Sequence, residues 1–271
     1  MNEFPLFAAE VGWPHQNVVV ARRLGSTQTL ARRIAAVYAA DGEPAPPFWV
    51  LAHAQESGRG RRGRTWSSPP GRGIYATRGV TAAEVDEPGR LPLAIALALA
   101  EALDEFLPPE RPVRLKWPND LIVAGRKLGG VLIEAPTDTA GALLVGFGVN
   151  HGHSTEELAA VPGAESGRAA TSLTLEGGPV PGLGATARAL IGAVEAEIAR
   201  RGELPELVHR YAARSLHRPG DLLACKLGER VVTGIFRGFG PAGELRLATE
   251  GGETNVAAGE ILEPFPEVGH E

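Results

Sequence analysis

The stretch QESGRGRRGRTWSSPPGRGIY, residues 55–75, lies between two apolar runs and has the periodicity of neither a helix nor a strand. The runs at 48–54 and 74–80 predict buried strands, so the stretch between them predicts a loop. Its segment GRGRRGRTW, Gly58–Trp66, is the densest cationic cluster of the chain and is called the glycine-arginine loop below. The arginines interleaved with its three glycines are Arg59, Arg61, Arg62 and Arg64.

The glycine-arginine loop suits the binding of a phosphate or a carboxylate. Glycines let backbone N–H groups approach an anion closely, and guanidinium groups add fixed charge with forked donors. Because four neighbouring cations repel one another, we expect the loop to be mobile alone and to be ordered by an anion. A solvated arginine-rich loop or a nucleic-acid patch would carry the same charges. A dinucleotide fingerprint is excluded, because GxGxxG should open a helix and here it leads into Pro69 and Pro70.

The residues before the loop predict a strand, a tight turn and a helix. Residues 18–24 form a short β-branched run that ends at Gly25. Ser26 or Thr27 then stands at the N-cap of an amphipathic segment that continues to about Ala40.

The residues after the loop predict a helix at 91–107, ended by Pro108, and then a meander of strands. We expect Glu101, Asp104 and Glu105 to form a solvated face of that helix. The strands of the meander are expected at 113–117, 120–123, 128–135 and 142–149. Residues 151–182 predict little beyond loop, and 185–201 predict a helix. His151 and His153 are expected at the surface, because no further ligand pattern accompanies them.

The sequence changes character near Pro219, where short strands with close turns begin. They are expected at 221–226, 230–239, 244–249 and 254–262 and predict a small β-barrel, with 218–220 as linker. We therefore divide the chain into an N-terminal domain, 1–217, and a C-terminal domain, 218–271.

Composition indicates a globular protein. The chain has 271 residues, of which 44% are hydrophobic and 22% charged, and a formal net charge of -5. This acidic balance argues against non-specific nucleic-acid binding, and the most apolar segment, 91–103, is too short to span a bilayer. The first residues carry no basic region of a secretory signal, so we expect a cytoplasmic protein. The single cysteine, Cys225, leaves no internal disulfide or multi-thiolate metal site.

Lysine is rare. Only Lys116, Lys127 and Lys226 stand among the 27 lysine and arginine residues. The first two lie in LKWPND and GRKLGG, where a compact ammonium suits a carboxylate or phosphate oxygen; chance would explain either one alone. Asp120 could hold Mg²⁺ through one carboxylate and waters, could orient Lys116, or could be a turn residue after Pro118. The run GxxxxGK[ST] precedes neither lysine, so the sequence has no P-loop.

Taken together, these motifs resemble the biotin protein ligase family in order and spacing. The resemblance rests on STQ at 26–28, the stretch 55–75, KWPND at 116–120, RKLGGVLIE from Arg126 and GFGVN at 146–150. It covers residues 18–150 closely and the C-terminal β-rich segment more loosely. It implies an α+β fold with a mixed central sheet flanked by helices, related to lipoate ligases and class II synthetases, and a small C-terminal SH3-like β-barrel.

The resemblance also implies a two-step ligase reaction that uses ATP, Mg²⁺ and biotin. The biotin carboxylate attacks the α-phosphate of ATP to give biotinyl-5′-AMP and pyrophosphate, and an acceptor lysine then attacks the mixed anhydride. The implied acceptor is the biotin carboxyl carrier domain of acetyl-CoA carboxylase or a related carboxylase, with neither DNA nor a membrane as partner. Some members carry an N-terminal winged-helix domain, but here the pattern begins within about twenty residues of Met1, so we expect no repressor function.

Two alternatives to this function stay open, namely a lipoate or octanoate ligase and a nucleic-acid-binding module that uses the RGRRGR run. The first would attach lipoate or octanoate, in place of biotin, to an acceptor domain. The second would bind DNA or RNA in a salt-dependent way without ATP turnover. The family includes dimers, so a monomer and a homodimer are both compatible with the sequence.

Roles of single residues are implied by their positions in these motifs. Lys127 resembles the lysine that bridges the biotin carboxylate and the α-phosphate, Lys116 a second phosphate contact, and Asp120 a metal ligand or a partner of lysine; Arg61 completes the catalytic set. Contacts to biotin are implied for Ser26, Thr27, Gln28, Gln55, Arg59, Gly60, Arg61 and Lys127. Contacts to the nucleotide are implied for Arg59, Arg61, Arg62, Arg64, Trp66, Lys116, Asn119, Lys127 and Asn150. Gln28 departs from the asparagine common at its position, and helix capping or a turn would also explain Ser26 or Asn150.

Overall fold

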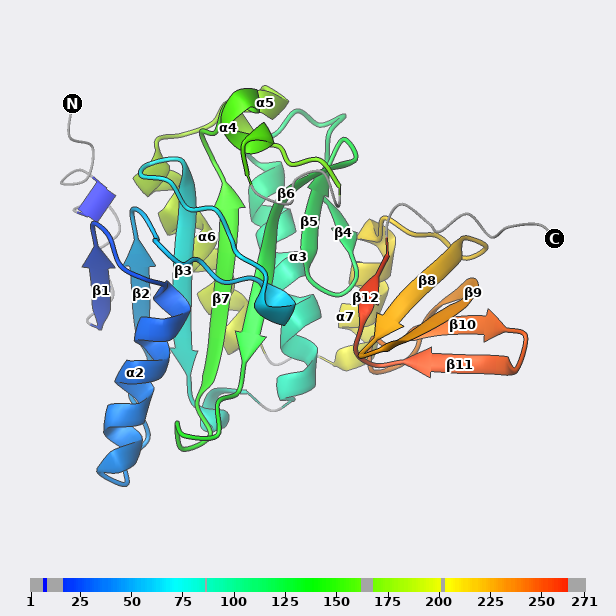
Figure 1. The fold of residues 1–271 in the computed structure, drawn as a ribbon, viewed down its shortest axis with the longest axis horizontal. Coiled ribbons are helices and arrows are strands. Elements are labelled where there is room, and N and C mark those ends of the chain that lie inside the picture. Colours follow the sequence, from blue (N-terminus) through cyan, green and yellow to red (C-terminus); the bar gives the residue numbers. More distant parts are fainter. Residues whose placement is uncertain (1–6, 9–16, 86, 162–167, 201–202, 263–271) are drawn as a thin grey trace.

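A seven-stranded mixed sheet forms the centre of the computed structural model, which describes residues 7–8, 17–85, 87–161, 168–200 and 203–262 (Figure 1). The strand order is β1-β2-β3-β7-β6-β5-β4, and only β1 and β2 are parallel neighbours. The strands are β1 Val18–Ala21, β2 Phe48–Ala52, β3 Gly73–Val80, β4 Arg114–Lys116, β5 Asp120–Val123, β6 Arg126–Glu134 and β7 Leu143–Asn150. The predicted mixed sheet and the antiparallel meander β4 to β7 are confirmed.

Both faces of this sheet are covered by helices. Side chains alternate along β2, so Trp49 and Leu51 join one apolar cluster while Phe48 and Val50 join another. The first cluster contains α3, Leu91–Asp104, and α6, Leu183–Ala199; the second contains α2, Thr27–Ala40. Figure 1 shows α2 on one face and α3 and α6 on the other. The flanked α+β architecture follows from a central strand that is apolar on both sides.

The described structure contains three further α-helices, two of them in the segment 151–182 that was expected to be loop and one in a segment for which the sequence predicted no element. These are α4 Thr155–Ala159, α5 Leu173–Glu176 and α7 Leu204–Arg214. The first begins at a capping box, in which Ser154 and Glu157 bond each other's backbone N–H groups, and the sequence STEE carries that signal. Helix α7 is amphipathic and buries Leu207 and Tyr211.

Helix α7 also explains why the acidic face of α3 is not simply solvated. Arg210 lies 2.8 Å from Glu101, and Arg214 lies 2.6 Å from Asp104. Asp104 additionally accepts a hydrogen bond from the backbone N–H of Val113, 2.8 Å away. These carboxylates therefore dock α7 onto α3 while staying partly exposed to solvent, so the expected solvated face also serves as a contact between the two helices.

The C-terminal part is a five-stranded antiparallel sheet with the order β11-β10-β9-β8-β12. Its strands are β8 Leu222–Leu227, β9 Arg230–Phe239, β10 Leu245–Thr249, β11 Gly252–Val256 and β12 Glu260–Ile261. The single strand expected at 254–262 is thus two strands at opposite edges of the sheet. The chain crosses between them past Gly259, where a Cβ would lie 2.7 Å from Cδ2 of Leu227 and 3.1 Å from the carbonyl of Lys226, so a larger residue would require these neighbours to shift. The division at 217/218 falls between α7 and β8 and stays a prediction.

Among the described residues, no helix is both long and apolar enough to cross a membrane.

Core packing around α3 yields the first prediction. Leu99 is fully buried, whereas Val37 on α2 is 64% exposed. Truncating a buried leucine removes apolar contacts and leaves a cavity, so Leu99→Ala should lower the free energy of unfolding by about 2–5 kcal/mol. Val37→Ala should change it by less than about 0.5 kcal/mol. Urea unfolding followed by circular dichroism measures both, and equal losses would contradict the assigned core.

Candidate active site

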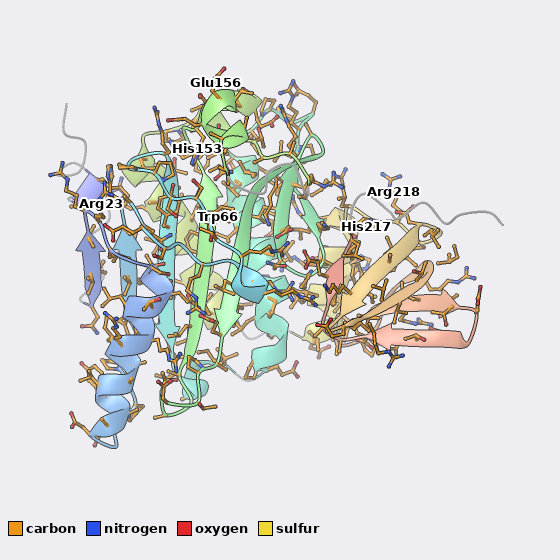
Figure 2. The ribbon with its side chains drawn as sticks, in the orientation of Figure 1. Arg23, Trp66, His153, Glu156, His217 and Arg218 are labelled. Carbon is orange, nitrogen blue, oxygen red and sulfur yellow. The ribbon has the colours of Figure 1, made fainter. Side chains whose placement is uncertain are left out.

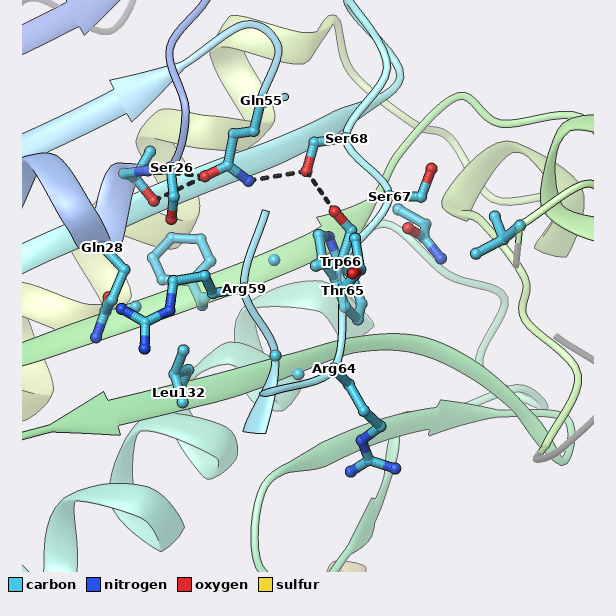
Figure 3. Close-up of a pocket in the computed structure, with 18 of the residues that line it drawn as sticks. Ser26, Gln28, Gln55, Arg59, Arg64, Thr65, Trp66, Ser67, Ser68 and Leu132 are labelled. Atoms are coloured by element: carbon cyan, nitrogen blue, oxygen red, sulfur yellow. Dashed lines mark hydrogen bonds between the residues drawn. The ribbon is translucent and has the colours of Figure 1, made fainter. Parts of the chain in front are cut away.

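A cavity of about 730 Å³ lies beside the N-terminus of α2. It is lined by the turn 26–28, by much of the segment 54–70, and by residues of β6 and β7 (Figure 3). The sheet supplies its floor, and the segment 54–70, which the sequence predicts to be loop, supplies one wall.

Two glycines of β7 make room for this cavity. Gly146 and Gly148 are two residues apart, so both face the same side of the strand. A Cβ on Gly146 would lie 2.5 Å from Oε1 of Gln28, and one on Gly148 would lie 2.6 Å from Nε1 of Trp66. Gln28 and Trp66 therefore pack directly against bare backbone, which explains the glycines in GFGVN.

A hydrogen-bond network fixes the polar end of the cavity near α2. Gln55 accepts a hydrogen bond through Oε1 from the backbone N–H of Thr27, at 2.8 Å, and donates through Nε2 to Oγ of Ser68, at 2.8 Å. The hydroxyl of Thr77 donates to Oε1 of Gln28, 3.0 Å away. Figure 3 shows Gln55 and Ser68 joined in this way above Ser26 and Gln28. The amides of both glutamines are thus held in one orientation.

Three buried polar atoms of the cavity lining have no hydrogen-bond partner among the described residues. They are Oγ of Ser26, Nε1 of Trp66 and Nδ1 of His153. Buried polar groups are normally paired, so a bound molecule or water at these atoms would complete the site.

The prediction that His151 and His153 lie at the surface was wrong, because both side chains are buried. His151 is 8% exposed and His153 2%. Burial lowers the pKa of both imidazoles, and for His153 the nearby Glu157 carboxylate counteracts this. His151 is held by the carbonyl of Pro181, 3.0 Å from Nε2, while His153 lines the cavity (Figure 2). Both rings therefore favour the neutral state.

An ion pair at the cavity joins Lys127 and Asp120. Nζ of Lys127 donates to Oδ1 of Asp120 over 2.7 Å and lies 5.7 Å from the ring centroid of Trp66. Backbone bonds on both sides hold the lysine, because its N–H donates to the carbonyl of Ala169 and its carbonyl accepts from Thr171. A cation is thus kept in place between a carboxylate and an aromatic face.

Arg61 adds a second cation to the part of the cavity that contains Lys127 and Asp120. Its guanidinium donates to Oδ1 of Asn119 over 2.9 Å, and Asn119 in turn donates to the carbonyl of Val131. Burial lowers the pKa of Arg61, and the carboxylate of Asp120 counteracts this. The glycine-arginine loop and the KWPND segment therefore meet at one place.

The structure gathers most of the residues that the sequence singles out. The cavity is lined by Ser26, Thr27, Gln28, Gln55, Arg59, Gly60, Arg61, Arg64, Trp66, Asn119, Asp120, Lys127 and Asn150. Lys116 and Arg62 are not among the lining residues, so their contacts to nucleotide stay predictions. Asn150 donates to the carbonyl of Thr171, which gives it a structural part in addition.

Other lining residues were missed by sequence reasoning. Ser68 and Thr77 orient the two glutamines, and His153 reaches the cavity from the segment expected to be loop. Thr77 had a visible signal, since it is a polar residue inside the apolar run 74–80. His153 had none, because its burial depends on segments distant in the sequence.

No cluster of three or more His, Cys, Asp or Glu side chains that could hold a metal ion occurs in the described part of the chain. Asp120 offers a single carboxylate, one oxygen of which is bonded to Lys127. A cation at Asp120 would therefore need most of its ligands from a bound substrate and water.

Comparisons with known proteins agree with this geometry. Residues 20–150 match the model of the biotin/lipoate A/B protein ligase family. A biotin--[acetyl-CoA-carboxylase] ligase of Mycobacterium tuberculosis is 31% identical over 95% of this chain and 92% of its own length. One of Paracoccus denitrificans is 33% identical over 79% and 89%. The Aquifex aeolicus biotin protein ligase in complex with biotin and ATP superposes with a TM-score of 0.73, at 26% identity, over 91% of this chain and 98% of that one. The chain therefore belongs to the biotin protein ligase family.

Proposed function

We propose that this chain activates biotin with ATP to biotinyl-5′-AMP and then transfers the biotinyl group to a lysine of a biotin carboxyl carrier domain. The observation that carries the proposal is the meeting of Lys127, Asp120 and Arg61 at a cavity whose polar end is ordered by Gln55. Acetyl-CoA carboxylase, which the names of the two relatives specify, is the acceptor that we infer. A cytoplasmic location remains part of the proposal.

In the first step, a carboxylate oxygen of biotin forms a bond to the α-phosphorus, and the bond to pyrophosphate breaks. Negative charge then accumulates on the oxygens between two anionic substrates, and fixed cations stabilise it. Lys127 is assigned to bridge the carboxylate and the α-phosphate, because its ammonium is already held at the cavity. Asp120 holds that ammonium in position over 2.7 Å, which favours its lysine-positioning role.

The ends of the bound intermediate can be assigned from the lining. The unpaired Oγ of Ser26 and the network of Gln55 suit the polar ring of biotin. The indole of Trp66 offers a flat face for adenine, and Arg59 and Arg61 contribute charge near the phosphate. In the second step the acceptor amine attacks the acyl carbon, AMP leaves, and the amine loses a proton.

Mg²⁺ supplies charge neutralisation on the phosphates of ATP when it is bound. The residues present fit a metal that arrives with the nucleotide, since Asp120 is the single carboxylate assigned to it. The metal stays part of the proposal.

The reaction itself is tested by exchange of labelled pyrophosphate into ATP. We expect exchange with biotin and none above background with lipoate or octanoate, followed by labelling of a carrier domain when it is added. Exchange supported by lipoate alone would replace the proposal with the lipoate alternative. Tight, salt-dependent binding of DNA or RNA without exchange would favour the nucleic-acid alternative instead.

Loss of the bridging cation should stop the first step. Lys127→Ala should slow biotin-dependent exchange by at least roughly a hundredfold, the usual effect of removing a group that stabilises transition-state charge. Arg230→Ala is the control, because Arg230 is exposed on β9 and does not line the cavity. Normal exchange in Lys127→Ala would refute the assignment.

Loss of Arg61 should instead release the intermediate. Arg61→Gly should raise the rate at which biotinyl-AMP escapes by roughly ten- to a hundredfold, because a hydrogen bond to a charged group contributes about 1.5–3 kcal/mol. The escaped adenylate would then label lysines of bystander proteins, which a streptavidin blot detects. Arg218→Gly, an exposed residue far from Trp66 in Figure 2, serves as control. Unchanged retention of the adenylate in Arg61→Gly would contradict the role.

A further inference from the structure

The arginines at the tip of the glycine-arginine loop bind the C-terminal sheet. Arg61 donates to the carbonyl of Gly259 over 3.1 Å, and Arg62 donates to the carbonyl of Lys226 over 2.8 Å. Nη1 of Arg64 lies 2.5 Å from Oε1 of Glu260, and Nε of Arg62 lies 3.8 Å from its Oε2. Three of the four arginines thus reach acceptors on a single edge of that sheet.

These acceptors form one surface. Glu260 opens β12 and is paired in register with Lys226 of β8. Figure 1 shows β12 on the side of the C-terminal sheet that faces the seven-stranded sheet. Glu260 is the one acceptor in the set that carries a formal charge, and it faces two arginines.

The backbone of the glycine-arginine loop links these contacts with the C-terminal sheet to the cavity. It is a tight hairpin in which Arg59 pairs with Thr65, the N–H of Gly60 donates to the carbonyl of Arg64, and the N–H of Trp66 donates to that of Gly58. Arg61 and Trp66, which line the cavity, lie on either side of Arg64 in this hairpin. The contacts that hold Arg64 in place therefore also restrain the indole of Trp66 and the guanidinium of Arg61 at the cavity.

We propose that Glu260 is a positioning residue for the glycine-arginine loop, because its carboxylate is the counter-charge that holds the loop tip at the cavity before substrates bind. The sequence predicts repulsion among four arginines, and an external anion would be needed to offset it. Here Glu134 of β6 offsets Arg59, 2.8 Å away, and the C-terminal sheet supplies the anion for Arg62 and Arg64. Retention of the adenylate then depends on a residue that does not line the cavity, a consequence that rests on the proposed function.

The solvent exposure of Arg64 and Glu260 sets how much their ion pair can contribute to anchoring the loop. The side chain of Arg64 is 57% exposed and that of Glu260 23%, so water screens much of their attraction. One such pair changes an equilibrium by roughly fivefold, equivalent to about 1 kcal/mol at 1.4 kcal/mol per tenfold. Glu260 should therefore shift the fraction of time for which the loop is anchored without being needed for folding.

Limited trypsin digestion of the full chain without ligands tests the anchor directly, because trypsin cuts after arginine. In Glu260→Gln, cleavage between residues 59 and 64 should be roughly fivefold faster than in the wild type. Glu253→Gln, which breaks an exposed pair with Arg246 elsewhere on the same sheet, should leave it unchanged. Thermal unfolding of both variants checks that the fold is kept. Equal cleavage in all three proteins would overturn the proposal.

A double-mutant cycle then tests the link to the intermediate. Glu260→Gln should speed the escape of biotinyl-AMP, whereas adding it to Arg64→Gln should add little, because the residue acts through that arginine. Fully additive effects would overturn the proposal. A wild-type chain that makes no biotinyl-AMP would refute the proposed function, and the trypsin experiment would still decide whether Glu260 anchors the loop.

Discussion

The ion pair between Lys127 and Asp120 is the interaction on which the rest of the site depends. An ammonium placed where two anions must meet is useful only if it does not move when charge develops. Its carboxylate partner, the face of Trp66 and two backbone bonds to the segment 169–171 meet that requirement. Folding of the protein therefore fixes the ammonium of Lys127 before either substrate binds.

The surrounding sheet both supports this ion pair and leaves space around it. The glycines of β7 leave bare backbone where Gln28 and Trp66 pack, and the antiparallel meander brings β5 and β6 next to each other so that Asp120 and Lys127 can meet. Above this floor the glycine-arginine loop is held from the other side by the C-terminal sheet. The two sheets thus act on the same cavity, one through its floor and the other through the loop that forms its wall.

Sequence reasoning predicted the elements whose pattern is local and missed those that depend on distant contacts. The strand, turn and helix from 18 to 40 and the meander from 114 to 150 carry period-two or helical spacing, and the structure confirms them. Helix α7 was missed although its spacing is amphipathic, and the split of 254–262 was missed because it reflects a crossing between sheet edges. The gathering of Lys127, Asp120 and Arg61 was predicted, whereas the burial of His153 and the anchoring of Arg62 and Arg64 by Glu260 and its neighbours needed the tertiary structure.

The central claim is that Lys127, held in place by Asp120, bridges the two reacting groups. A crystal structure of the chain with a non-hydrolysable analogue of biotinyl-AMP tests it most directly. The account predicts Nζ of Lys127 within hydrogen-bonding distance of both the acyl oxygen and the phosphate oxygen, with Arg61 closed over the same group and Asp120 still beside the lysine. An analogue bound with its acyl-phosphate group away from Lys127, or contacted by other cations alone, would contradict it.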